Sequence, residues 1–137
     1  MSRAILPTLS AFLALAACAT RSELRSLPSD AGIARSYTGS FDKVKLACRD
    51  ALGQLKLSIK EGEKDTGPLT ETTYRIIASQ GISTGTVGRY ARILIEDQKG
   101  TCVVRILVRS KAESQTNDQL DPIIAEDLHK RIAALLK

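Results

Sequence analysis

The sequence contains few aromatic residues. They make up 4% of the 137 residues, and tryptophan is absent. Its hydrophobic core must therefore be aliphatic, and a face that stacks nucleic-acid bases on aromatic rings is disfavoured. The formal net charge of +5 is mild, and the basic residues do not form a run. We therefore expect no nucleic-acid partner.

Histidine is also scarce, since His129 is the only one. A single histidine without cysteine or carboxylate residues at ligand spacing does not form a metal site, and we expect His129 on the surface of the last predicted helix. The sequence shows no Ser/His/Asp set and no carboxylate pair suited to acid–base chemistry. We therefore expect no metal, no cofactor and no enzymatic activity.

Long apolar runs are absent except near the N-terminus. Residues 4–17 are apolar apart from Thr8 and Ser10, and Arg3 precedes them. This layout is typical of a secretory signal peptide, and the run is shorter than the roughly 20 apolar residues of a membrane-spanning helix. We interpret residues 1–17 as a signal peptide that is removed.

The apolar run ends at a cysteine. The segment Leu15-Ala16-Ala17-Cys18 resembles the lipobox of bacterial lipoproteins. The resemblance implies that cleavage occurs before Cys18, that its thiol carries a diacylglycerol, and that its new amine is acylated, for example by palmitate. A cysteine thiolate is nucleophilic enough for this modification, and several acyl chains give a stable membrane anchor. Ala19 rather than aspartate follows Cys18, which implies an outer-membrane location facing the periplasm.

Residues 18–38 show no sustained helical or strand period and are rich in serine, arginine, glycine and alanine. They predict a lipidated N-terminus and a flexible tether of about 20 residues, long enough to hold a domain roughly 25 Å from the membrane. Residues 39–137 then predict a single domain.

That domain begins and ends with an amphipathic helix. Ser40 or Thr38 can cap the first helix, and Asp121 and Pro122 suit the start of the last one. Strands are predicted between the helices at 57–61, 72–79, 89–97 and 101–109. Short links favour an antiparallel sheet. The predicted fold class is therefore α+β, a two-layer α-β-β-β-β-α sandwich with about four strands and both helices on one face. Seven residues of the last two strands are expected to face the helices: Ala91, Ile93, Ile95, Cys102, Val104, Ile106 and Val108.

Two cysteines remain after Cys18. Cys48 lies on the apolar face of the first helix, and Cys102 has the inward parity of the last strand. In an oxidising periplasm they could form a disulfide. The alternative is two buried free thiols, because helix–sheet contacts often hold Cα atoms farther apart than a disulfide allows. The sequence leaves both alternatives open.

The outer face of the sheet mixes arginine and apolar residues. This composition occurs in contact surfaces, and it nominates Arg75, Tyr90, Arg92, Arg105 and Arg109 as a partner surface. In the alternative interpretation, long arginine stems shield a sparse apolar face. The glycine-rich stretch 81–89 lacks the spacing and lysine of a phosphate-binding loop, and we interpret it as a loop between strands.

From about Tyr37 to Leu136 the chain is similar to small proteobacterial envelope lipoproteins of unknown function. The similarity rests on a helix with VKLACRDALGQLKLSI, strands with RILIED and TCVVRILV, and a terminal amphipathic helix. It implies a helix-flanked sheet and no catalytic residues. The favoured function is a non-enzymatic binding or accessory lipoprotein that contacts an envelope protein, peptidoglycan or anionic lipid. The alternative is a small-ligand carrier with its ligand between helices and sheet.

Overall fold

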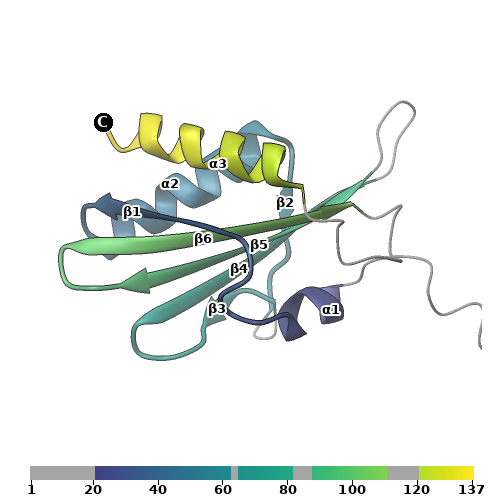
Figure 1. The fold of residues 1–137 in the computed structure, drawn as a ribbon, viewed down its shortest axis with the longest axis horizontal. Helices are drawn as coiled ribbons and strands as arrows, with labels where there is room; N and C mark the ends of the chain where they lie inside the picture. The colour runs from purple at the N-terminus through teal and green to yellow at the C-terminus, as the bar shows by residue number, and fades with distance from the viewer. Residues whose placement is uncertain (1–20, 63–64, 82–87, 111–120) are drawn as a thin grey trace, which may run out of the picture.

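In the residues that the structure describes, the fold consists of a six-stranded antiparallel sheet and three helices (Figure 1). The computed structural model describes residues 21–62, 65–81, 88–110 and 121–137. The helices are α1 (Arg21–Ser26), α2 (Phe41–Gln54) and α3 (Pro122–Leu135). The strands are β1 (Ile33–Thr38), β2 (Ser58–Ile59), β3 (Gly67–Pro68), β4 (Thr73–Gln80), β5 (Arg89–Asp97) and β6 (Thr101–Ser110).

The sheet has the order β1-β6-β5-β4-β2. Strand β3 pairs with the edge of β4 that does not contact β5. The predicted α+β class is confirmed, whereas the predicted number of about four strands is too low. The three long strands β4, β5 and β6 match the strands predicted at 72–79, 89–97 and 101–109 to within one residue. The two missed strands, β1 and β3, lie at the sheet margins, where local alternation is weak.

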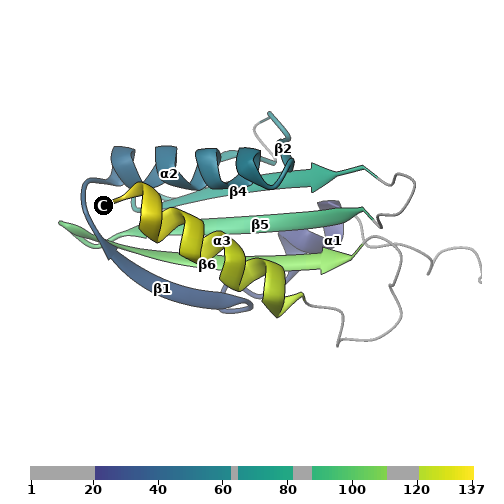
Figure 2. The same cartoon turned by 90° about the horizontal axis from the view of Figure 1, so that it is seen from above.

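Helices α2 and α3 cover the same face of the sheet, which we call the inner face (Figure 2). All seven residues predicted to face the helices belong to the core cluster there. Ser40 caps α2, and its side chain accepts a hydrogen bond from the Lys43 amide. Asp121 caps α3 with Pro122 at the first position, as predicted. Leu135, at the end of α3, lies outside this core and is 40% exposed.

The N-terminal segment forms a third layer. Helix α1 lies on the opposite face of the sheet, which we call the outer face (Figures 1 and 2). Strand β1 follows and pairs with β6 from Ile33–Ile106 to Thr38–Thr101. The prediction of a flexible tether over residues 18–38 is therefore wrong for residues 21–38, which are folded against the sheet. The predicted two-layer arrangement therefore lacks the third layer, which the N-terminal segment forms.

Gly32 carries the chain from the outer face into β1. Its φ angle is +106°, a conformation that favours glycine. A Cβ atom at this position would lie 2.5 Å from the carbonyl oxygen of Ile106. Only glycine permits this close approach to the β6 backbone, so Gly32 fixes where the N-terminal segment passes the sheet edge.

Candidate functional site on the outer face of the sheet

The structure brings the predicted partner-surface residues together on the outer face. The register places Arg92 between Ile77 and Leu107, and Leu94 between Arg75 and Arg105. Tyr90 pairs with Arg109 in the next row. Side chains at these positions share one face because strand residues alternate. The sequence thus predicted the composition of this face correctly.

The same face is partly covered by the chain's own N-terminal segment. Leu24 of α1 is completely buried against Ile77 and Leu107. Three partly buried side chains surround this contact: Leu27, Ala31 and Tyr90. The apolar part of the predicted partner surface therefore already has an intramolecular partner.

Arg92 holds the C-terminal end of α1. Its Nη1 atom donates to the carbonyl oxygens of Leu24 and Leu27, both at 2.8 Å, and its Nη2 atom donates to the carbonyl of Pro28 at 2.7 Å. A cation is favourable there, because the last carbonyls of a helix carry partial negative charge. Arg92 is only 2% exposed. The predicted partner surface is thus wrong at Arg92, whose donors bind the chain itself.

Burial and neighbouring cations both act on this guanidinium. Burial lowers the pKa of Arg92 below its ordinary value, and the charges of Arg75 and Arg105 lower it further. Arginine nevertheless stays protonated in proteins. The three carbonyl dipoles therefore stabilise a buried positive charge, since they replace the water that the side chain loses.

The other arginines of this face lie around α1. Arg105 donates to the carbonyl of Asp30 at 3.1 Å, and Arg109 lies 3.7 Å from a carboxylate oxygen of Glu23. Burial lowers the pKa of Arg75, and nearby Arg25 lowers it further whereas Asp65 opposes the shift. The face is thus lined by cations beside a small number of carboxylates.

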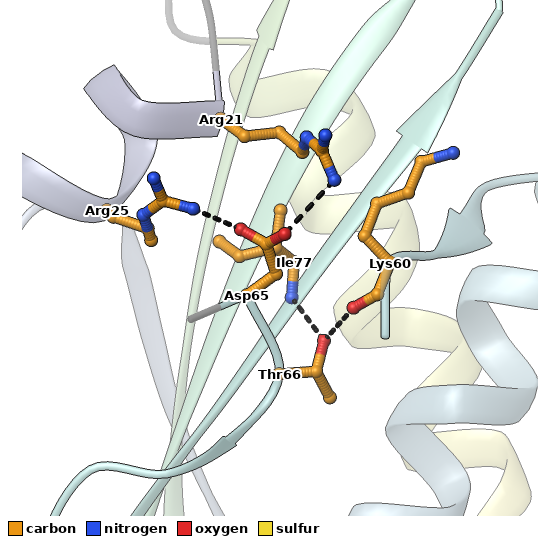
Figure 3. A network of polar contacts seen from close by, with 6 residues as sticks. All are labelled: Arg21, Arg25, Lys60, Asp65, Thr66 and Ile77. Atoms are coloured by element: carbon orange, nitrogen blue, oxygen red, sulfur yellow. Dashed lines mark hydrogen bonds and ion pairs between the residues drawn. The ribbon is translucent and has the colours of Figure 1, made fainter. Parts of the chain in front are cut away.

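One of these carboxylates ties α1 to the sheet edge (Figure 3). Asp65 bonds to Arg21 at 3.0 Å and, through its other oxygen, to Arg25. Thr66 follows directly and connects the residue after β2 with β4: its hydroxyl donates to the carbonyl of Lys60 and accepts from the amide of Ile77. Two arginines from α1 therefore share one carboxylate.

A hollow of about 190 Å³ opens on the outer face beside the turn between α1 and β1. Ser29 and Asp30 form one side, and five sheet residues form the rest: Thr73, Leu94, Glu96, Val103 and Arg105. This lining offers both a cation and carboxylates. Sequence reasoning missed the hollow, because one wall comes from the segment that was interpreted as a tether.

The remaining predicted positions lie elsewhere. His129 is 3% exposed, so the prediction of a surface histidine is wrong. Its Nε2 atom lies 2.7 Å from the carbonyl oxygen of Ile33, which can only accept, and Tyr37 Oη lies 2.6 Å from its Nδ1 atom. The neutral ring therefore carries its proton on Nε2 and accepts from the Tyr37 hydroxyl. His129 joins α3 to β1.

Cys48 and Cys102 are free and fully buried in the core under α2 and α3. This arrangement matches the alternative of two buried thiols. Burial, and next the nearby Cys102, raises the pKa of Cys48 to about 12. A thiol with a raised pKa is a poor nucleophile.

Cys18 and most of the glycine-rich stretch 81–89 lie outside the described residues. The described ranges contain no group of three or more histidine, cysteine or carboxylate side chains that could hold a metal ion. No helix in that part of the chain is long and apolar enough to cross a membrane.

No known protein family and no curated protein matches the chain.

Proposed function

We propose that this chain is a lipoprotein anchored through Cys18 in the outer membrane, where it acts on the periplasmic side as a non-enzymatic binding or accessory component of the envelope. The proposal starts from the lipobox resemblance of Leu15 to Cys18. The observation that supports it most is the position of α1, which begins at Arg21, three residues after Cys18. Such spacing suits a domain that works at the membrane surface.

The anchor can be tested in cells. The full chain, expressed in a Gram-negative bacterium fed with labelled palmitate, should incorporate the label and fractionate with the outer membrane. Cys18→Ser should abolish incorporation, because no other residue of the lipobox can form the thioether. The matched control is Cys48→Ser, which leaves Cys18 intact and should retain the label. Equal labelling of the Cys18→Ser variant would refute the anchor.

A small-ligand carrier is the second candidate. It is supported by a largely apolar hollow of about 300 Å³ between α3 and the β1–β6 edge, lined in part by Ile33, Ile106, Val108 and Ala125. This volume lies at the lower limit of ligand pockets. Ala125→Met should fill the hollow and weaken binding of an apolar fluorescent probe, whereas exposed Ala133→Met on the same helix should not. Absence of saturable binding to the unmodified protein would exclude this candidate.

A further inference from the structure

We propose that the outer face, with α1 on it, is the membrane-facing side of the protein and seats on anionic phospholipid head groups. The inference rests on the proposed anchor at Cys18 and adds the face and the kind of lipid that it contacts. It replaces the expectation of a domain held away from the membrane by a tether.

The first step concerns length. Arg21 is the third residue after Cys18, and a fully extended chain spans at most about 3.6 Å per residue, so the two lie within about 11 Å of each other. The head-group region of one leaflet is itself about 5–8 Å thick. A lipid-linked Cys18 therefore holds the first turn of α1 at the head groups.

The second step concerns rigidity. Helix α1 is fixed on the sheet by buried Leu24, by the three hydrogen bonds of Arg92 and by the Asp65 carboxylate. The anchor position therefore determines which side of the whole domain approaches the bilayer. Helices α2 and α3 lie across the sheet from α1 and face away (Figure 2).

The third step concerns charge. Arg21 and Arg25 share one carboxylate, so this group keeps a net positive charge. The Arg21 side chain is 45% exposed, which leaves donors available to a ligand. Arg105 adds a further cation on the same face, beside the hollow. Guanidinium groups fit phosphate oxygens through paired hydrogen bonds, and cations near an anionic leaflet are attracted to it.

The test measures which face lies near the lipid. The mature lipidated protein is reconstituted in vesicles of phosphatidylcholine with phosphatidylglycerol, and a fluorophore is attached at Ser29→Cys or at Ala133→Cys. Both positions are small and exposed; Ser29 lies beside the outer-face hollow, and Ala133 lies on α3. Cys48 and Cys102 are fully buried and should stay unlabelled in the native protein. Nitroxide-bearing head groups should quench the Ser29 label several-fold more than the Ala133 label.

Charge is tested in the same system. Arg21→Glu should reduce the quenching at position 29, and so should vesicles of phosphatidylcholine alone. Lys130→Glu is the matched control, because Lys130 is exposed on α3 and should leave the quenching unchanged. Salt at 1 M should also weaken the contact, since the Debye length falls to about 3 Å.

The outcomes separate the two proposals. If Cys18 is labelled by palmitate but quenching is equal at both positions, or stronger at position 133, the anchor stands. The assignment of the outer face as the membrane-facing side would then be overturned. Quenching at position 29 that does not respond to Arg21→Glu or to lipid charge would overturn the anionic-lipid contact. Failure of palmitate labelling would overturn the anchor itself.

Discussion

Arg92 donates hydrogen bonds to three backbone carbonyls of the α1 segment, so its replacement should release α1. Arg92→Met keeps the length of the side chain but removes the donors. We expect faster tryptic cleavage after Arg25 and a loss of about 1–3 kcal/mol in the free energy of unfolding, typical of a charged hydrogen-bonding group. Limited proteolysis and urea denaturation measure the two effects.

The matched control for this variant is Arg105→Met. Arg105 is half-buried and donates one hydrogen bond to a backbone carbonyl, that of Asp30. Its replacement should therefore leave the cleavage rate after Arg25 nearly unchanged. Equal cleavage in both variants would contradict a specific role for Arg92.

Two glycines give opposite predictions for the same substitution. Gly32→Ala places a Cβ atom 2.5 Å from the Ile106 carbonyl oxygen at a positive φ angle. We expect it to destabilise the protein by about 2–4 kcal/mol. Gly53 lies in α2, where an added Cβ would meet nothing within 4 Å outside its own stretch of helix. Gly53→Ala should therefore stabilise by about 0.5–1 kcal/mol. Thermal unfolding of both variants would show whether the signs differ.

At the scale of elements, β1 and α3 are joined by polar groups, of which His129 is buried. His129 bonds to Ile33 and Tyr37, and Arg35 forms an ion pair with Glu126 at 2.6 Å beside them. Burial lowers the pKa of His129 below its ordinary value of 6.5, although the bond to the Ile33 carbonyl opposes the shift. These contacts between β1 and α3 therefore favour the neutral form of the His129 ring.

This shift predicts how stability depends on pH. Between the lowered pKa and about 6.5, the unfolded chain binds more protons than the folded protein. The free energy of unfolding should therefore be fully maintained above that range and should fall as pH decreases through it. Urea denaturation at pH 7.5 and 5.5 measures the change. His129→Gln should show a smaller pH dependence, and an equal dependence in both proteins would argue against the histidine as its source.

The elements also differ in how far the sequence predicts them. Strands β5 and β6 were predicted to within one residue, because the residues that face the helices recur at every second position and a short turn joins the strands. The caps at Ser40 and Asp121 located α2 and α3. By contrast, α1 and β1 depend on distant partners, Arg92 and the β6 backbone, which local patterns do not reveal. The candidate face was predicted by composition, but the segment that covers it was not.

At the scale of the whole molecule, the buried thiols report on global opening. Cys48 and Cys102 are fully buried under both long helices, and burial, with the nearby Cys102 as a further cause, raises the pKa of Cys48 to about 12. At pH 8, a thiol reagent should react with Cys48 and Cys102 on the order of 100-fold more slowly than with a free thiol. In denaturant, both cysteines should react completely. If the denatured protein, before any reduction, contained no thiol that the reagent can titrate, Cys48 and Cys102 would instead form the disulfide.

The chain as a whole passes around its own sheet. Its described part begins on the outer face with α1, passes the edge at Gly32, runs along β6 as β1, and then reaches the inner face with α2. A single continuous segment thus connects both faces. Whatever binds or restrains residue 21 acts on one side of the molecule only.

The six-residue helix α1 has a consequence for the order of folding. Isolated helices shorter than about 12 residues are marginal in water, and α1 is stabilised by Leu24 against Ile77 and Leu107 and by Arg92 of β5. These partners come together only when β4, β5 and β6 are paired. Helix α1 should therefore form only after these three strands have paired, although it precedes them in the chain.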